Sequence, residues 1–200
     1  MKHSLLAVLG SILCLLLTSC VTTSEYPLSS PEMAQPDPKL VGTWHEKSDN
    51  DETFEFTVKD AHWMHIKGRK KDKPGDSYDT FVTVIDGNRY LNVRLLGKDE
   101  QGHPPKKEFF LFRYEVAGHV LTTWDIDQDK ADEAVRTGKL KGTIRQDKNA
   151  MKVGNPPHPD FDVLLQDSGV NMVKFIQHAR PKALFSDKAS EMVRVENAKP

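Results

Sequence analysis

The fold is decided in residues 80–96, which read TFVTVIDGNRYLNVRLL. Thr80 to Ile85 is β-branched throughout apart from Phe81, and such residues favour strands. Asp86-Gly87-Asn88 separates this run from a second one, Tyr90 to Leu96. Asp-Gly between two runs of this kind is a strong signal for a tight hairpin. We therefore predict two antiparallel strands joined at Asp86-Gly87-Asn88.

The same kind of pattern continues on both sides of this hairpin. Phe54, Phe56 and Val58 alternate with polar residues, a period of two that is typical of strands. Strands spaced by 8–15 residues with short turns favour an antiparallel meander. Besides the central hairpin, we expect strands at Phe54–Val58, Met64–Ile66, Phe109–Val116 and His119–Ile126.

Two helices interrupt the second half of the chain. We expect the first at about Asp129–Thr137, followed by Gly138, and the second at Gly169–Ala179, stopped by Pro181. Asp127 or Asp129 is the expected cap of the first helix, and Ser168 or Asp167 that of the second. Two further strands lie between them, at Lys141–Arg145 and Phe161–Gln166. The fold class is therefore mainly β (α+β), an antiparallel meander forming a barrel or half-barrel with two short helices in the C-terminal half.

The leader resembles that of a bacterial lipoprotein. Lys2 precedes an apolar run from Leu5 to Leu17, which is too short for a bilayer span of about 20 residues and is typical of a signal peptide. It ends in Leu17-Thr18-Ser19-Cys20, which resembles the lipobox. The resemblance implies cleavage before Cys20 and acylation (palmitate among the chains) of its sulfur and its amine. The alternative is an ordinary cleaved signal with a free Cys20.

The leader also accounts for both cysteines of the chain, Cys14 and Cys20. The folded domain then has no disulfide and no thiol nucleophile. Val21 is not aspartate, which by the same resemblance implies an outer-membrane anchor with the domain in the periplasm. We expect a signal peptide at 1–19, a lipidated flexible tether at 20–38, a β-rich domain at 39–186 and a polar C-terminal tail at 187–200, in which residues 192–195 form at most a short docked strand.

Leu40-Val41-Gly42-Thr43-Trp44 opens the domain. Gly-x-Trp at the start of a meander resembles the lipocalins and the wider calycin group. The resemblance implies that Gly42 and Trp44 close one end of a barrel, with the tryptophan packed beneath the first strand. In that group an arginine covers the tryptophan, and Arg145 is the candidate for that role. A helix before the last two strands departs from the lipocalin pattern.

No catalytic, metal or cofactor motif emerges. His62 and His65 point to opposite faces of a strand, which disfavours a shared metal ion. The acids at 125, 127, 129 and 132 lack the glycine and glutamate of a calcium loop, so helix capping explains them better. Ser168 lacks the nucleophile elbow. The net charge of −1, or −2 once Lys2 leaves with the leader, gives no broad footprint for nucleic acid. The lysine cluster at 67–73 is expected to be a solvated hairpin loop rather than an anionic-lipid or polyanion site.

Aromatic residues provide the candidate lining of a ligand pocket, and they suit a plain hydrophobic core equally well. They are Trp63, Tyr90, Phe110, Phe112 and Trp124. The first functional hypothesis is a non-enzymatic, membrane-anchored module that binds a small apolar or lipidic ligand. The second is an envelope protein-interaction or assembly accessory that uses a sheet edge or the 67–73 loop. An enzyme is the least favoured, because no nucleophile–base set is visible.

Overall fold

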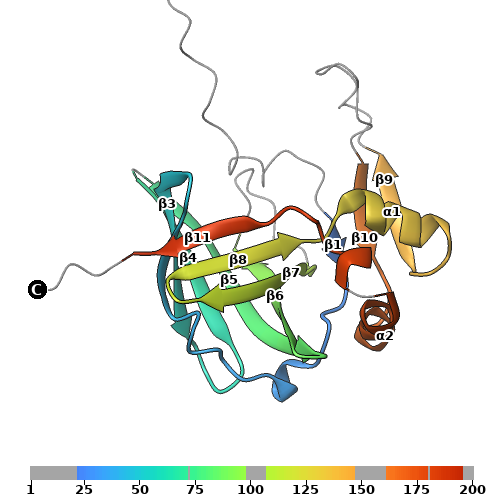
Figure 1. The fold of residues 1–200 in the computed structure, drawn as a ribbon, viewed down its shortest axis with the longest axis horizontal. Helices are drawn as coiled ribbons and strands as arrows, with labels where there is room; N and C mark the ends of the chain where they lie inside the picture. The colour runs from blue at the N-terminus through green and yellow to red at the C-terminus, as the bar shows by residue number, and fades with distance from the viewer. Residues whose placement is uncertain (1–21, 72, 98–106, 147–160, 180, 196–200) are drawn as a thin grey trace, which may run out of the picture.

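A closed antiparallel barrel of eight strands forms the larger part of the protein (Figure 1). The structure is a computed structural model, and it describes residues 22–71, 73–97, 107–146, 161–179 and 181–195. The predicted fold class is confirmed, and the barrel is complete rather than half-open. Its strands, in the order in which they are hydrogen-bonded, are β11 (Ser190–Arg194), β2 (Gly42–Glu46), β3 (Asp49–Val58), β4 (Met64–Lys70), β5 (Lys73–Ile85), β6 (Asn88–Leu96), β7 (Phe110–Ala117) and β8 (Val120–Asp125).

The hairpin between β5 and β6 forms as predicted. Ile85 pairs with Asn88, which leaves a two-residue loop. Asp86 has φ 50° and Gly87 has φ 80°. Two consecutive positive φ angles are what a tight hairpin turn needs to match the twist of its strands. The Asp-Gly pair therefore sets the register of β5, the longest barrel strand, against β6.

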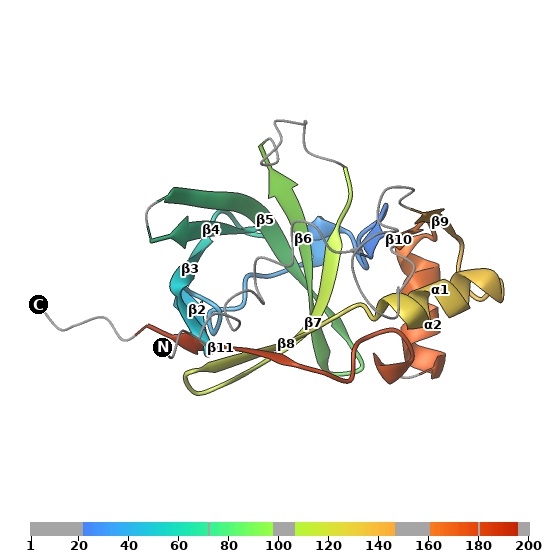
Figure 2. The same cartoon turned by 90° about the horizontal axis from the view of Figure 1, so that it is seen from above.

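A second, smaller layer covers one side of the barrel, as Figure 2 shows from above. It contains the helices α1 (Gln128–Arg136) and α2 (Gly169–Ala179), with a short 3₁₀ turn at η3 (Pro181–Ala183). Another 3₁₀ turn, η2 (Pro31–Met33), belongs to the segment before β2 and lies outside this layer. It also contains a three-stranded sheet in the order β1 (Thr23–Ser24), β10 (Phe161–Leu165) and β9 (Gly142–Gln146). The two strands predicted between the helices thus exist, but they do not complete the meander.

Both helices lie within one residue of their predicted bounds. The side chain of Asp127 caps α1 by accepting a hydrogen bond from the backbone N–H of Lys130. Gly138 follows the helix with φ 70°, a left-handed conformation that suits glycine at this position. No helix within the described ranges is long and apolar enough to cross a membrane.

Two hydrophobic clusters stabilise these layers. The interior of the barrel holds Leu40, Trp44, Phe56, Met64, Ile66, Val82, Leu91, Val93, Tyr114 and Leu121. The other cluster joins the outer surface of the barrel to the helical layer, through Leu28, Ile85, Tyr90, Leu111, Ile126, Ala131, Ala134, Leu140, Val163, Leu165, Met172, Ile176, Leu184 and Phe185. Because alternate strand residues point to opposite faces, the same strands supply both clusters.

Residues 22–38 differ from the tether expected from their composition. Leu28 is 2 % exposed, and its N–H donates to the side chain of Asn92 on β6. Ser29 forms a hydrogen bond with Thr83 on β5, and Asp37 is also buried. Few apolar residues are needed to dock this segment, because buried polar groups of the barrel bind its backbone and hydroxyl groups. We refer to residues 22–40 as the strap.

The expected polar tail also differs from the structure. Ser190–Arg194 forms β11, which pairs with β8 on one side and β2 on the other. Met192 lies opposite both Leu121 and Glu46. This strand closes the ring because both of its edges find backbone partners, although only one of its five residues is a large apolar residue that faces the interior.

Candidate functional site

Trp44 seals one end of the barrel, which we call the tryptophan end. The side chain is fully buried, and its Nε1–H donates to the carbonyl of Leu40 over 2.7 Å. The guanidinium of Arg194 lies 4.2 Å from the centroid of the tryptophan ring. Its nitrogens donate to the carbonyl oxygens of Val41 and of Lys39, the latter at 2.6 Å. The guanidinium of Arg194 thus stacks on the indole of Trp44 and holds the end of the strap beside β2.

Gly42 is required here for two reasons. Its φ of 134° is a conformation that other residues rarely adopt. A Cβ at this position would also collide with the guanidinium of Arg194. Gly42 therefore lets the backbone pass close to Arg194, beside the buried Trp44.

The prediction of Arg145 as the residue over the tryptophan is wrong. Arg145 lies on β9, 3.8 Å from the carboxylate of Glu108. The covering residue is Arg194, on a strand that the sequence pattern places in the polar tail. Its signal is the isolated arginine in Met192-Val193-Arg194-Val195, where a charge interrupts a short apolar run.

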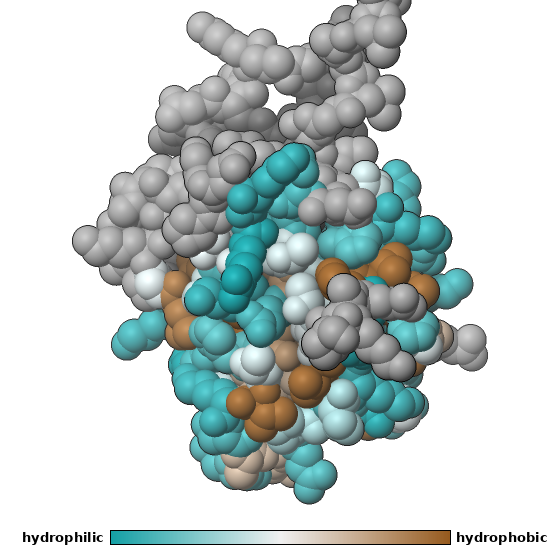
Figure 3. Space-filling view, turned by 90° about the vertical axis from the view of Figure 1, so that its left-hand side faces the viewer, coloured by the Kyte–Doolittle hydropathy of each residue, from teal (hydrophilic) through white to brown (hydrophobic). Residues whose placement is uncertain are grey.

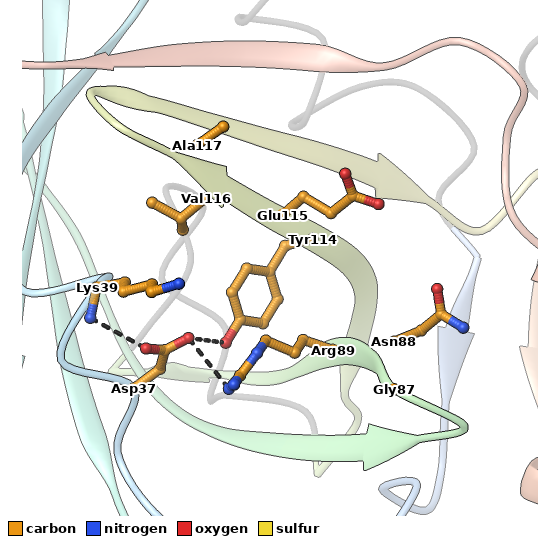
Figure 4. Close-up of a pocket in the computed structure, with 9 residues that line it drawn as sticks. All are labelled: Asp37, Lys39, Gly87, Asn88, Arg89, Tyr114, Glu115, Val116 and Ala117. Atoms are coloured by element: carbon orange, nitrogen blue, oxygen red, sulfur yellow. Dashed lines mark hydrogen bonds and ion pairs between the residues drawn. The ribbon is translucent and has the colours of Figure 1, made fainter.

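A polar pocket of about 280 Å³ opens at the tryptophan end (Figure 4). At its base, Asp37 accepts a 2.8 Å hydrogen bond from the hydroxyl of Tyr114 and lies 3.3 Å from Arg89. The other oxygen of the carboxylate accepts from the backbone N–H of Lys39. The remaining lining comes from Gly87, Asn88, Glu115, Val116 and Ala117.

The polar groups at the base of this pocket are bound to one another. Burial raises the pKa of Tyr114 far above its ordinary range, and the hydrogen bond to Asp37 raises it further. A phenol held protonated in this way is a hydrogen-bond donor and not a nucleophile or base. Its partner Asp37 is occupied as an acceptor by three donors. The network therefore fastens the strap to the barrel.

The opposite end of the barrel, the far end, is lined differently. Here β2 turns into β3 and β4 into β5. The inward-facing apolar side chains remain partly exposed instead of being sealed, and they are Phe54, Tyr78, Phe110, Phe112 and Met192. Between the two ends, buried side chains such as Ile66 and Val93 fill the interior. We call the five partly exposed side chains at the far end the cup.

The five predicted lining residues separate into two groups. Phe110 and Phe112 face the interior of the barrel and belong to the cup. Tyr90 and Trp124 face outwards into the cluster beneath the helices, where each lies opposite Arg113 on β7. Trp63 lies outside the barrel against Phe81, with ring centroids 4.9 Å apart. The prediction of Trp63, Tyr90 and Trp124 as pocket residues is wrong. Alternating residues of a strand lie on two faces, and the sequence pattern does not indicate which face points into the barrel.

A buried carboxylate on the outer surface was missed by sequence reasoning. The side chain of Asp79 is 2 % exposed, and Lys59 contacts it at 2.6 Å, His65 at 3.4 Å and Arg94 at 3.5 Å. Burial raises the pKa of this carboxyl, but the hydrogen bonds and charges of its neighbours outweigh burial and lower the pKa below its ordinary value. Arg94 also lies 4.9 Å from the ring centroid of Trp63. One carboxylate thus binds Lys59, Arg94 and the ring of His65, so the cluster acts as a stabilising network.

The lysine-rich hairpin is compensated by its neighbours. Arg69 lies 3.3 Å from Glu55, and Lys71 lies 3.8 Å from Asp51. Both acids belong to β3, which pairs with β4 along this hairpin. Exposed pairs of this kind contribute little stability, but they cancel the local charge. The two acids therefore offset part of the positive charge of the hairpin.

The remaining candidates have local structural roles. His62 forms a hydrogen bond with the carbonyl of Ala34, and His65 belongs to the Asp79 cluster. The hydroxyl of Ser168 accepts from the N–H of Asn171 in the first turn of α2. Across the described parts of the chain, no group of three or more histidine, cysteine or acidic side chains converges as metal ligands would.

The described residues therefore form a polar pocket at the tryptophan end and a cluster of partly exposed apolar side chains, the cup, at the far end, with the strap along the outside of the barrel. Comparison with models of protein families, with curated proteins and with solved structures found no match to this chain.

Proposed function

We propose that this chain is an acylated lipoprotein of the bacterial envelope whose barrel binds a small apolar or lipidic ligand without catalysis. The observation that carries the proposal is the contrast between the two ends of the barrel. Trp44 is fully buried at one end, whereas Phe54, Phe110 and Phe112 face inwards at the other and stay partly exposed. Aromatic side chains are a usual lining of ligand sites, and these remain accessible from solvent.

The width of the barrel limits the size of the ligand. An eight-stranded barrel has an interior just wide enough for side chains or for one small ligand. Since the middle is packed, the ligand inserts an acyl chain or ring between the aromatic side chains and leaves its polar part in solvent. The lipobox at Leu17–Cys20 supports the same conclusion, because it would hold the domain beside a reservoir of such molecules.

The test is binding of a fluorescent fatty acid, together with solvent extraction of protein purified without detergent. The variant Phe110→Glu places a charge in the cup, and Val84→Glu places the same charge at an exposed position of the tryptophan end. We expect F110E to weaken binding at least tenfold, about 1.4 kcal/mol, and V84E to leave it unchanged. Thermal unfolding of both variants checks the fold, and Phe110→Leu serves as a milder second change. Equal affinity in all variants, or no extractable ligand and no probe binding, would contradict the proposal.

A second candidate function rests on the edge of the small sheet. Among the described strands, β9 pairs only with β10, so its other edge has no strand partner. A free edge is able to accept a strand from another protein. Crosslinking in cells from Thr143, an exposed residue of β9, would identify such a partner for an assembly accessory. If no protein is crosslinked to position 143, this second candidate function is rejected.

A further inference from the structure

The first described residues are fixed to the rim of the far end. The hydroxyl of Thr23 donates to the carboxylate of Glu108 over 2.7 Å. Ser24 and Phe109 exchange two backbone hydrogen bonds, of 2.9 and 2.7 Å. Phe109 directly precedes β7, which begins at the far end of the barrel. Thr22 is itself buried. The strap is therefore anchored at its start and not only along its length.

This placement leaves almost no free chain before the proposed anchor. Cys20 stands two residues before Thr22, and two residues span at most about 7 Å. A flexible tether of the expected 18 residues would allow a mean separation of more than 20 Å, at about 5–6 Å times the square root of its length. By contrast, the nine residues of β6 separate the two ends of the barrel by about 30 Å along the strand. Acyl chains on Cys20 would enter the bilayer close to the far end.

We infer that the domain lies against a lipid surface with the far end of its barrel towards the membrane and the tryptophan end away from it. The inference rests on the acylation of Cys20 that is part of the proposed function. It also specifies the ligand source, because a lipid tail would reach the cup from the adjacent leaflet with little exposure to water. The face shown in Figure 3 carries separate hydrophobic patches within a largely hydrophilic area.

The orientation is measurable with single cysteines, since the chain has no cysteine after Cys20. Ser48 lies in the exposed turn between β2 and β3 at the far end, and His119 in the exposed turn between β7 and β8 at the tryptophan end. The mature acylated variants Ser48→Cys and His119→Cys would carry a fluorophore in vesicles that contain spin-labelled lipids. We expect the label at position 48 to be quenched severalfold more strongly than the label at position 119.

A matched pair of proteins shows whether the short connection sets the orientation. Insertion of ten Gly/Ser residues between Val21 and Thr22 keeps the anchor and lengthens the connection, and we expect it to remove most of the difference in quenching. Equal quenching at both positions without the insertion, or stronger quenching at position 119, would overturn the inferred orientation.

Mass spectrometry of the mature protein distinguishes a wrong orientation from a missing acyl anchor. A mass with acyl groups, together with equal or reversed quenching, rejects the orientation alone. A mass without acyl groups rejects the anchor and with it the orientation, while the fatty-acid assay still decides whether the cup binds a ligand.

Discussion

The carboxylate of Asp37 accepts a 2.8 Å hydrogen bond from the hydroxyl of Tyr114, a residue 77 positions further along the chain. The bond joins the strap to β7 at a buried position. A buried polar group that loses its partner costs about 1–3 kcal/mol. This pair therefore contributes substantially to keeping residues 22–40 in place.

We predict that Asp37→Asn and Tyr114→Phe each lower the free energy of unfolding by about 1–3 kcal/mol. The double variant should lose less than the sum, with a coupling energy of about 0.5–3 kcal/mol, because both changes break one contact. Urea unfolding of the four proteins measures this cycle. Glu115→Gln is the control, since Glu115 is exposed and should change stability by less than about 0.5 kcal/mol. Strict additivity of the two losses would show that the contact does not form in solution.

The stability of the protein should depend on the planar shape of the Arg194 side chain as well as on its charge. Arg194→Ala removes the stacking on Trp44 and two hydrogen bonds to carbonyl groups, and we expect a loss of about 2–4 kcal/mol. Arg194→Lys keeps the charge but not the planar group, so it should recover less than half of that loss. Thermal unfolding measures both.

Arg145→Ala provides the comparison for these two variants. Arg145 is half-exposed and makes one long ion pair, so its loss should cost less than about 1 kcal/mol. If Arg145→Ala proved as damaging as Arg194→Ala, the assignment of the covering arginine would have to change.

Docking of the strap is testable through one apolar side chain. Leu28 is 2 % exposed in the cluster between barrel and helices, and we expect Leu28→Ala to cost about 2–4 kcal/mol. Met33 belongs to the same segment but is 82 % exposed, so Met33→Ala should be nearly neutral. If residues 22–40 were a flexible tether, neither Leu28→Ala nor Met33→Ala would change the free energy of unfolding. Limited proteolysis within residues 25–36 should accelerate only in Leu28→Ala.

The Asp79 cluster gives a prediction for pH. The pKa of Asp79 is lowered in the folded protein, whereas an unfolded aspartate has a pKa of about 3.9. The stabilisation is therefore fully present above about pH 4 and is lost as the pH falls through the lowered value. The difference in the free energy of unfolding between the native protein and Asp79→Asn should be constant from about pH 5 to 7 and shrink below about pH 4.

Lys59→Met tests the cause of this dependence. Lys59 is the nearest cation to Asp79, at 2.6 Å, and its removal should raise the pKa of the carboxyl. The loss of stability on acidification should then begin at higher pH than in the native protein. An unchanged acid midpoint in urea titrations would mean that Lys59 does not stabilise the carboxylate.

Local patterns in the sequence predicted the hairpins and the helices well. Asp86-Gly87 determines its own turn, because the two positive φ angles and the adjacent apolar runs are encoded within a few residues. The same holds for Asp127 and Gly138 at the two ends of α1. Trp44 follows a glycine at the start of β2, and it is fully buried in the barrel.

Features that depend on distant partners were not predictable in this way. The strap looks like a linker because its stability comes from Asn92 and Thr83, which are more than 50 residues away. β11 looks like a tail because it needs both β2 and β8 to complete its hydrogen bonds. The inward and outward faces of Tyr90 and Trp124 were likewise undetermined until a second layer was known to cover the outer surface.

The position of β11 also determines when the barrel can be completed. Arg194 bonds to a carbonyl 153 residues earlier in the chain, and until Ser190–Arg194 is available both β2 and β8 present an unpaired edge. A chain delivered from its N-terminus would therefore pass through a curved, seven-stranded sheet that is able to recruit foreign strands. Closing so long a loop is slow. The edges of β2 and β8 would remain open to such pairing until β11 is inserted.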